Sequence, residues 1–320
     1  MRESATSVKS RPVLTVLAGG VGAARFLRGL IRAVEPSALT VIVNTADDER
    51  FFGLAVSPDL DTITYTLAGA AGPRGWGLRD DSFTCLSALD RFYNARWFHL
   101  GDRDLATHIY RTDRLARGAS LSTVTSEISR SFGVAARVLP MSNDPVRTVL
   151  HTTEGVLSFQ HYLVARRAEP QVRRVTYAGA ARARPGPGVL AAIANAEAVI
   201  VAPSNPFLSI GPILAIPGIR RALRARSGPV AAISPLVAGR AVSGPLARLL
   251  RRFDLPVSSV GIASRYRSFL DTLVIDRHDT ADTPALAAIG IRAIVSDTIL
   301  TPPSRAERVA RDLLRALGLT

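Results

Sequence analysis

Hydrophobic and polar positions along the chain fall into blocks that predict strands and helices in turn. An apolar run from Val13 to Ala18 is short and ends at glycines, which is typical of a buried strand. A helical spacing follows over about residues 23–34, and a second apolar run covers Leu39 to Val43. The first ~70 residues therefore predict a β-α-β unit that leads into an acid-rich loop.

The middle of the chain changes its pattern twice. Apolar spacings near 3.6 predict helices over Ser82–Tyr93 and Leu115–Phe132. From Ala136 to Tyr177, valine, threonine and aromatic residues predict strands, with a hairpin turn at Thr153-Glu154-Gly155. The break at residues 183–188, with the sequence ARPGPG, separates this part from the rest of the chain.

After this break the alternation of strands and helices returns. The predicted strands are Ala198–Ala202, Val230–Ile233, Ser258–Ile262, Thr272–Ile275 and Arg292–Val295, and Arg305–Leu317 is predicted as an amphipathic helix. Strands that alternate with helices form mostly parallel sheets covered on both faces. We therefore predict an α/β fold, with a Rossmann-like, mostly parallel sheet, helices on both faces, and ligands outside the carboxyl ends of the strands.

The same pattern predicts one domain with an insertion. Residues 1–12 are polar and are expected to form a disordered tail, and residues 13–320 form a single domain. In this interpretation the Rossmann-like core comprises residues 13–70 and 189–320. A helical and β-rich subdomain of about residues 71–188 is inserted between them.

Charge and cysteine content narrow the class of protein. The 320 residues carry a formal net charge of +14, almost all of it from arginine, because Lys9 is the single lysine. The arginines are scattered and aromatic residues make up 6%, whereas nucleic-acid surfaces cluster both, so we expect no nucleic-acid partner. No apolar run reaches the ~18 residues that a membrane span needs. Cys85 is the single cysteine, which excludes an intrachain disulfide and a cysteine-built metal site and favours the cytoplasm.

Gly19, Gly20 and Gly22 lie between the first predicted strand and the first predicted helix. Such a turn lets the backbone approach a phosphate, while the helix N-terminus presents free N–H groups to it. A plain tight turn is the alternative. The dinucleotide fingerprint is incomplete because Arg25 occupies its third glycine position, and the Gly-Lys-Ser/Thr of a Walker-type loop is absent.

Acidic residues follow the second strand. Asp47 and Asp48 end it, and Asp59 and Asp61 come after Pro58. Carboxylates gathered at strand ends can hold Mg²⁺ together with waters and substrate phosphates. Two other interpretations stay open: Asp47 or Asp59 caps a turn or helix, or Asp48 binds a ribose hydroxyl.

A second polar segment runs from Trp97 to Asp104 and contains His99 and Arg103. Arg103 can pair with a phosphate or with the acids beside it. A solvated capping segment explains the stretch equally well, and His99 alone would usually be a surface or core-edge histidine.

A third polar segment follows the predicted strand Ala198–Ala202. The chain continues as Pro203-Ser204-Asn205-Pro206 and then Ser209. Small hydroxyl and amide side chains at a strand end suit a second phosphate or base cradle, but they are also ordinary turn residues.

Taken together and in order, these segments resemble the 2-phospho-L-lactate transferase family, which makes the deazaflavin coenzyme F-420. The resemblance covers roughly residues 14–314. It rests on the motifs AGGVGAARFLRGL, VNTADD, GLAVSPDLDT, WGLRDDSF, LGDRDLATH, LPMSNDPVRT, PSNPFLSIGPIL and SPLVAG with SGPLA. The family resemblance implies an enzyme, usually dimeric, that requires Mg²⁺ and joins the deazaflavin alcohol Fo to a phosphorylated acid supplied as a guanosine diphosphate conjugate.

Motif by motif, the resemblance also implies roles for particular residues. Asp61 and His99 would contact the deazaflavin, and Asp48 and Asp61 would be the catalytic acids and the metal ligands. The guanosine diphosphate cradle would comprise Gly19, Gly20, Gly22, Ser204, Asn205 and Ser209. Ala23 and the Phe51-Phe52 pair depart from the usual family pattern, and the second departure lies near the implied substrate site.

The implied reaction is attack of the terminal ribityl hydroxyl of Fo on the phosphorus attached to the acid, with GMP as the leaving group. Positioning and charge neutralisation dominate such transfers. Asp61 is the preferred residue to orient or deprotonate the hydroxyl. Its replacement by Asn should therefore reduce turnover far more than folding stability.

Two other functions compete with this interpretation. A nicotinamide-dependent oxidoreductase requires the complete glycine fingerprint, which is absent. A non-catalytic nucleotide-sugar-binding regulator would share the glycine turn and the Ser-Asn-Pro loop, but the Ser-Pro-Asp-Leu-Asp and Gly-Asp-Arg-Asp segments argue for the transferase. The donor acid stays open among phospholactate, phosphoenolpyruvate and 3-phosphoglycerate, and the arginine-rich, bacterial composition favours phosphoenolpyruvate.

Overall fold

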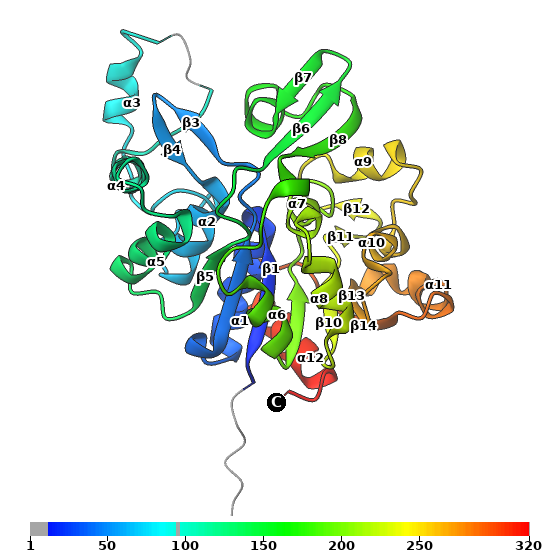
Figure 1. The fold of residues 1–320 in the computed structure, drawn as a ribbon. Coiled ribbons are helices and arrows are strands. Elements are labelled where there is room, and N and C mark those ends of the chain that lie inside the picture. The colour runs from blue at the N-terminus through cyan, green and yellow to red at the C-terminus, as the bar shows by residue number, and fades with distance from the viewer. Residues whose placement is uncertain (1–11, 94–96, 320) are drawn as a thin grey trace, which may run out of the picture.

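A parallel β-sheet forms the centre of the molecule (Figure 1). The computed structural model describes residues 12–93 and 97–319. Within them, seven strands pair in the order β14-β13-β10-β9-β1-β2-β5, and every pair is parallel. The strands are β1 (Leu14–Ala18), β2 (Leu39–Val43), β5 (Arg137–Pro140), β9 (Ala198–Val201), β10 (Val230–Ile233), β13 (Thr272–Asp276) and β14 (Arg292–Ser296). The predicted α/β fold with a parallel sheet is confirmed.

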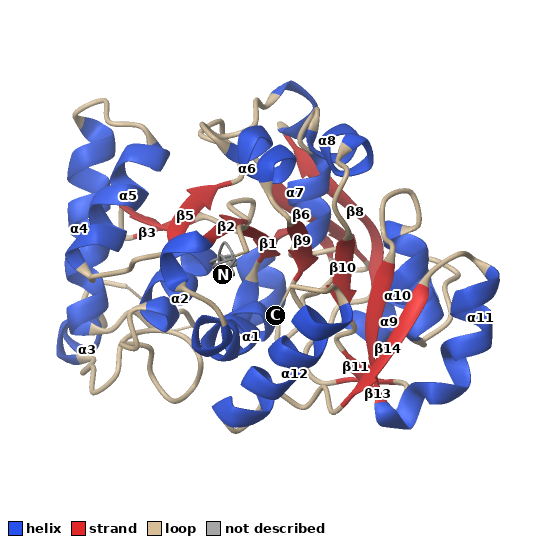
Figure 2. Cartoon of the chain, turned by 90° about the horizontal axis from the view of Figure 1, so that it is seen from below, coloured by secondary structure: helices blue, strands red, loops and turns tan. Residues whose placement is uncertain are grey.

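Helices cover both faces of this sheet (Figure 2). Val16 and Leu17 are fully buried on opposite faces, because successive side chains of a strand alternate. The Val16 face packs against α1 (Gly20–Ala33), α2 (Pro58–Leu67) and α12 (Pro303–Ala316), and the Leu17 face against α6 (Val189–Asn195), α7 (Ile210–Ala215) and α8 (Ile219–Ala225). Burial on both faces explains why the central strands are continuous apolar runs.

Smaller elements surround the sheet. A hairpin of β3 (Glu49–Phe51) and β4 (Leu54–Val56) lies near α3 (Thr84–Leu89) and α4 (Asp102–Ala116), and α5 (Leu121–Ser131) follows them (Figure 1). An antiparallel sheet has the order β7-β6-β8, from β6 (Arg147–Thr152), β7 (Gly155–Ser158) and β8 (Val172–Ala178). The remaining elements are β11 (Leu236–Val237), β12 (Arg240–Ala241), α9 (Leu246–Arg252), α10 (Ser259–Tyr266), α11 (Thr283–Ala288) and short helical turns at Pro36–Ala38, His161–Ala165, Ala180–Arg182 and Arg277–Asp282.

One predicted strand is wrong. Ser258–Ile262 is the start of helix α10, and β10 pairs directly with β13, so the sheet has no place for a strand between them. The Asp282 carboxylate accepts a hydrogen bond from the backbone N–H of Ser259 (2.7 Å) at the first turn. The short apolar run was ambiguous because periodicity alone does not separate a buried helix from a strand.

Two boundaries also differ from the prediction. The helical stretch predicted over Leu115–Phe132 is divided between the end of α4 and α5, with a turn at residues 117–120. Strand β5 lies inside the range predicted as an insertion, yet it is an edge strand of the central sheet. The division into core and insertion therefore stays an interpretation, and residues 1–11 of the predicted tail lie outside the described residues.

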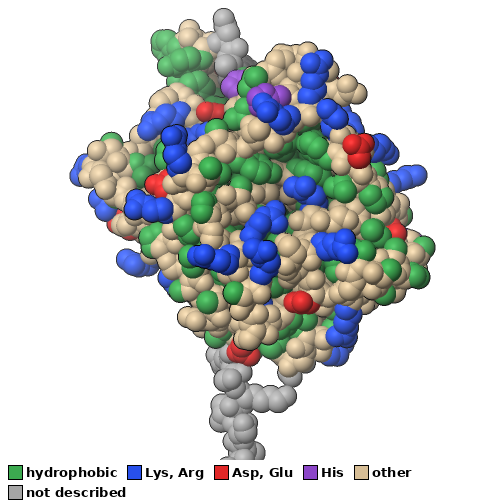
Figure 3. Space-filling model, turned by 45° about the vertical axis from the view of Figure 1, so that its right-hand side comes forward, with side chains coloured by type: hydrophobic (Ala, Val, Ile, Leu, Met, Phe, Trp, Pro, Cys, Tyr) green, Lys and Arg blue, Asp and Glu red, His purple; other side chains and the backbone are tan. Residues whose placement is uncertain are grey.

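The surface agrees with the scattered charge of the sequence. On the face in Figure 3, Lys and Arg side chains are spread between apolar and polar groups, with few acids among them. In the part of the chain that the structure describes, no helix has the length and apolar character needed to cross a bilayer.

Candidate functional site

A cleft lies at the carboxyl ends of the central strands, where the loops after β1, β2, β9 and β10 meet. It consists of two adjoining cavities of about 300 and 370 Å³. Both are lined by Gly20, Val21, Phe159, Leu163 and Ser209, so the cavities are continuous at the glycine turn. This is the position that the sheet topology predicts for a ligand.

The cavity of about 370 Å³ is built from backbone and short side chains and is here called the small-residue cavity. All six residues predicted as a cradle line it: Gly19, Gly20, Gly22, Ser204, Asn205 and Ser209. Gly20 has a φ of +70°, and a Cβ at Gly22 would overlap the carbonyl oxygen of Pro203. Ser204 Oγ donates to the Gly19 carbonyl (2.8 Å), which joins the two loops. Helix α1 thus begins at the cleft, and the first turn of a helix has N–H groups without an intrahelical partner, a favourable arrangement for a phosphate.

The other part, here called the acidic cavity, is lined by the carboxylates Asp47, Asp59, Asp61 and Asp104 together with His99 and His108. Asn44 Nδ2 donates to both Asp47 (2.9 Å) and Asp59 (3.0 Å) and holds them side by side. Asp59 also accepts from the Gly20 N–H (2.8 Å), which places this pair beside the glycine turn.

Negative charge is unfavourable on the buried carboxyl groups of Asp47 and Asp59. Burial raises the pKa of Asp59 to about 6, and burial together with the Asp59 charge raises the pKa of Asp47 well above its usual range. Asp47 Oδ1 is buried without a hydrogen-bond partner. Among the described residues, no Lys or Arg side chain pairs with either carboxylate. A divalent cation with oxygen ligands fits this pair, because Mg²⁺ takes one or two carboxylates plus substrate phosphates.

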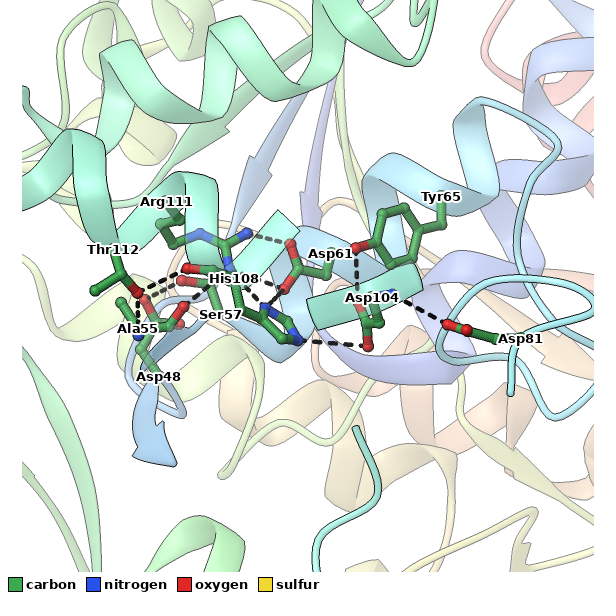
Figure 4. A network of polar contacts seen from close by, with 10 residues as sticks. All are labelled: Asp48, Ala55, Ser57, Asp61, Tyr65, Asp81, Asp104, His108, Arg111 and Thr112. Carbon is green, nitrogen blue, oxygen red and sulfur yellow. Dashed lines mark hydrogen bonds and ion pairs between the residues drawn. The ribbon is translucent and has the colours of Figure 1, made fainter. Parts of the chain in front are cut away.

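Asp61 has a different environment (Figure 4). Both of its oxygens are bonded to the guanidinium of Arg111, Oδ2 at 3.1 Å from Nη1 and Oδ1 from Nη2. Arg111 is only 2% exposed and also donates to the Ala55 carbonyl in strand β4 (3.3 Å). This buried, two-point ion pair fixes Asp61 at the wall of the acidic cavity.

His108 connects Asp61 and Arg111 to Asp104 in the same network (Figure 4). Its Nδ1 lies 3.3 Å from Arg111 Nη1, and its Nε2 lies 3.4 Å from Asp104 Oδ2. Because Arg111 has only donors, Nδ1 is the acceptor, and a neutral His108 carries its proton on Nε2, facing Asp104. Tyr65 donates its hydroxyl hydrogen to Asp104 Oδ1 (2.6 Å).

One face of helix α4 supplies this network. Asp104, His108 and Arg111 follow one another at spacings of four and three, so their side chains line up. Asp81 fixes the start of the helix by accepting from the N–H groups of Arg103 (2.7 Å) and Asp104 (3.0 Å). His108 and Arg111 are not among the residues predicted from sequence, although their spacing from Asp104 places all three on one helix face.

The acidic and basic residues of the Gly-Asp-Arg-Asp segment make different contacts. Asp102 caps α3 by accepting from Ser82 Oγ and from the N–H groups of Thr84 and Cys85, so the capping interpretation applies to this residue. Arg103 donates to the Arg79 carbonyl (2.9 Å) instead of to an acid.

Asp48 lies outside the acidic cavity. Asp48 accepts from Ser57 Oγ (2.8 Å), and burial raises its pKa to about 7. It lines a separate cavity of about 500 Å³, which shares Val56 with the acidic cavity. The predicted metal pair of Asp48 and Asp61 is therefore divided between two cavities and stays a prediction.

His99 does line the acidic cavity, where its ring lies 5.9 Å from that of Phe83 and 6.5 Å from that of Trp76.

Asp61, Asp104 and His108 form a second group that could hold a metal ion, with one ligand atom from each lying within 4.8 Å of the others. The Arg111 guanidinium already neutralises Asp61 there. The chemistry of the donors thus favours Asp47 and Asp59 for Mg²⁺, since Mg²⁺ prefers oxygen ligands and a site without a competing cation.

Comparison with known proteins identifies the family of the chain. The family model described as 2-phospho-L-lactate transferase CofD matches residues 14–294. A protein of Methanosarcina mazei named 2-phospho-L-lactate transferase is 38% identical over 95% of this chain and 100% of its own length. A protein of Streptomyces griseus named phosphoenolpyruvate transferase is 41% identical over 94% of this chain and 97% of its own length.

The fold has counterparts among solved structures. A crystal structure of a Bacillus halodurans protein matches with a TM-score of 0.64 and 18% identity, over 95% of this chain and 100% of that one. At this identity the match shows the fold alone. The family match and the relatives cover almost the whole length, and the predicted membership is confirmed: the chain belongs to the 2-phospho-L-lactate transferase family.

Proposed function

We propose that this protein transfers a phospho-acid from its guanosine diphosphate conjugate to the terminal ribityl hydroxyl of Fo and releases GMP, in the biosynthesis of coenzyme F-420. One observation carries the proposal: a phosphate-type cavity and an acid-lined cavity are continuous at Gly20 and Val21, beside Asp59. A diphosphate and an attacking hydroxyl can meet at that point.

The small-residue cavity is the proposed nucleotide site. Backbone N–H groups at the start of α1 would bind the diphosphate oxygens, and Ser204, Asn205 and Ser209 would line the remainder. Transfer of the phosphorus group then forms one O–P bond, to Fo, and breaks the O–P bond to GMP. The protein contributes mainly positioning and charge neutralisation.

The acidic cavity is the proposed acceptor site. Trp76, Phe98 and His99 offer ring surfaces for the deazaflavin, and Asp61 offers carboxylate oxygens to the ribityl hydroxyl. Arg111 already holds both oxygens of Asp61, so we assign Asp61 the role of orienting the hydroxyl more than that of removing its proton.

Asp47 and Asp59 would hold Mg²⁺, which supplies neutralisation of the diphosphate charge when bound. Asn44 keeps both carboxylates in place, and the Gly20 N–H ties Asp59 to the phosphate turn. The earlier assignment of Asp48 as a ligand and catalytic acid remains a prediction, because its carboxylate lines a different cavity.

A coupled assay tests the function. Purified protein is incubated with Fo, GTP, Mg²⁺, a partner guanylyltransferase and one of three acids: 2-phospholactate, phosphoenolpyruvate or 3-phosphoglycerate. Mass spectrometry of the deazaflavin identifies any product, and we expect one with phosphoenolpyruvate. Folded protein that binds Fo but yields no product with any of the three acids would contradict the proposal and favour the nucleotide-sugar-binding regulator.

We also propose a cytoplasmic homodimer, as the family resemblance implies. Light scattering after size-exclusion chromatography tests the oligomeric state. A mass of about twice the 34.1 kDa chain is expected, and a mass of one chain at micromolar concentration would contradict it.

A further inference from the structure

A third cavity, here called the arginine pocket, lies beside the cleft. It has a volume of about 170 Å³ and is lined by Arg25, Arg28 and Arg79 together with backbone and small residues of the 66–75 segment and of residues 300–303. Arg25, Leu300 and Thr301 also line the small-residue cavity, so the two spaces adjoin.

Arg25 is distinctive within the cleft. Among the described residues that line the acidic and small-residue cavities, it is the single Lys or Arg, whereas four aspartates line the acidic cavity. A guanosine diphosphate conjugate of a phospho-acid carries a diphosphate and, in addition, a carboxylate. Apart from a metal ion, the cleft therefore has one permanent cation for that carboxylate.

These arginines have no acidic partner in the structure. Within the described residues, Arg25 and Arg28 form no ion pair, and Arg79 donates to the Gly69 carbonyl (2.6 Å). All three side chains are exposed, and none of them pairs with an acid among the described residues that would compete with a bound anion. Arginine is well suited to this task because its planar fork binds a carboxylate at two points.

The helix geometry links the pocket to the reacting end of the cleft. Val21, Arg25 and Arg28 are spaced by four and three residues, so they form one stripe along α1. Val21 lines the acidic cavity and also the small-residue cavity, where the diphosphate is proposed to lie. A Cβ at Gly75 would overlap a Val21 methyl group, so Gly75 of the arginine pocket packs closely against Val21. The stripe therefore leads from the proposed diphosphate position at Val21 to Arg25, which lines both the small-residue cavity and the arginine pocket.

We infer that the arginine pocket binds the carboxylate of the transferred acid, with Arg25 at its entrance and Arg28 and Arg79 behind it. This inference rests on the proposed function and adds to it a subsite that distinguishes one small phospho-acid from another. In this arrangement the arginine pocket takes the acid while Fo occupies the acidic cavity, whose lining residues do not include these three arginines.

Kinetics with purified guanosine diphosphate conjugate test the inference. Arg25→Gln should raise the KM for the conjugate about tenfold or more, since a lost charge-assisted hydrogen bond has about that effect. Inhibition by GDP, which has no acid group, and binding of Fo should change less than about twofold. Arg221→Gln, at an exposed arginine of α8 that lines none of these cavities, is the matched control and should leave all constants unchanged.

Two results would overturn the inference. An unchanged KM in Arg25→Gln would exclude a contact with the donor, and an equal loss of GDP inhibition would assign Arg25 to the phosphates instead. Arg28→Gln and Arg79→Gln should alter the ratio of kcat/KM between donor acids, and an unchanged ratio in both would exclude selection by the pocket.

Failure of the proposed function can be told apart from failure of the inference. A wild-type protein that transfers no acid contradicts the function. Calorimetry of phosphoenolpyruvate binding to GMP-saturated protein then decides the inference, which requires binding by wild type and a clear loss in Arg25→Gln. No binding by wild type would overturn it.

Discussion

The two cavities of the cleft are shaped by different kinds of chemical group. The small-residue cavity is shaped by backbone: glycines, a helix N-terminus and short hydroxyl side chains. The acidic cavity is shaped by buried charge, with Asp61 and Arg111 paired and His108 and Asp104 beside them (Figure 4). Backbone sites tolerate the loss of a side chain but not the addition of one, whereas a buried charge network fails when one member is removed.

The largest effect is expected for Asp61→Asn. Its turnover should fall about a hundredfold or more, because the hydroxyl loses the group that orients it. The structure revises the accompanying expectation on stability: Arg111 would be left buried with a weaker partner, so the free energy of unfolding should also fall, by up to about 3–5 kcal/mol. Transfer kinetics and urea unfolding measure the two effects.

The double variant Asp61→Asn/Arg111→Met separates them. It removes the unpaired charge, so stability should recover in part while turnover stays low. Near-normal turnover in either variant would show that Asp61 contacts the substrate without orienting the hydroxyl for the reaction.

Arg111→Met should be the most destabilising single change in the acidic half. It leaves the Asp61 carboxylate buried without its cation and the Ala55 carbonyl without its donor, at a cost of about 3–5 kcal/mol. Chemical denaturation gives the value. A loss below about 1 kcal/mol would show that the ion pair is far more solvated than the 2% exposure of Arg111 indicates.

Gly22→Ala tests the backbone half. The added methyl group would overlap the Pro203 carbonyl oxygen, so either α1 or the Ser-Asn-Pro loop must shift, at about 1–3 kcal/mol. GDP affinity should fall while Fo affinity is retained, as calorimetry with each ligand can show. Equal losses for both ligands would mean that the two halves are not independent.

The pH dependence of stability tests the Asp47–Asp59 pair. Without Mg²⁺ the pKa of Asp59 is raised to about 6, so between about pH 4 and pH 6 the folded protein holds a proton that the unfolded chain has lost. The contribution of Asp59 to the free energy of unfolding is therefore fully present below about pH 4 and lost as the pH rises through 6. Urea unfolding in EDTA should show this fall. Excess Mg²⁺ should reduce it, and so should Asp59→Asn.

The smallest effect is expected for Arg114→Met, on the same helix as Arg111. Arg114 pairs with Glu127 on the surface (2.8 Å), where its side chain is 33% exposed. Exposed pairs contribute less than about 1 kcal/mol, so stability and turnover should change little. A loss as large as that of Arg111→Met would remove the distinction between buried and exposed charge on which the comparison depends.

The backbone half could be predicted from sequence, and the acidic half only in part. Gly19 to Gly22 and Ser204 to Ser209 are local patterns at strand ends, and parallel strands bring their carboxyl ends to one edge. Asp61 was predicted as a site residue, but its partner Arg111 lies 50 residues further along the chain, on helix α4. Such pairings depend on how α4 packs, which local pattern does not specify.

The pair Asp47 and Asp59 shows a second limit. Each was interpretable as a cap, and the neighbouring Asp48 and Asp61 fitted the same spacing. Only the tertiary arrangement places Asn44 between Asp47 and Asp59 and directs Asp48 into another cavity. The strand predicted at Ser258–Ile262 is wrong for a related reason, since a short apolar run alone does not separate a buried helix segment from a strand.

Simultaneous binding of the two ligands is the most direct test of the claim that the cavities form one reaction centre. The fluorescence of Fo, titrated with protein in Mg²⁺ with and without saturating GDP, measures it. We predict that GDP changes the Kd of Fo by less than about threefold and that a complex with one Fo and one GDP per chain forms. A Kd for Fo that rises in proportion to the GDP concentration would show that the ligands compete for one space, and would contradict the account.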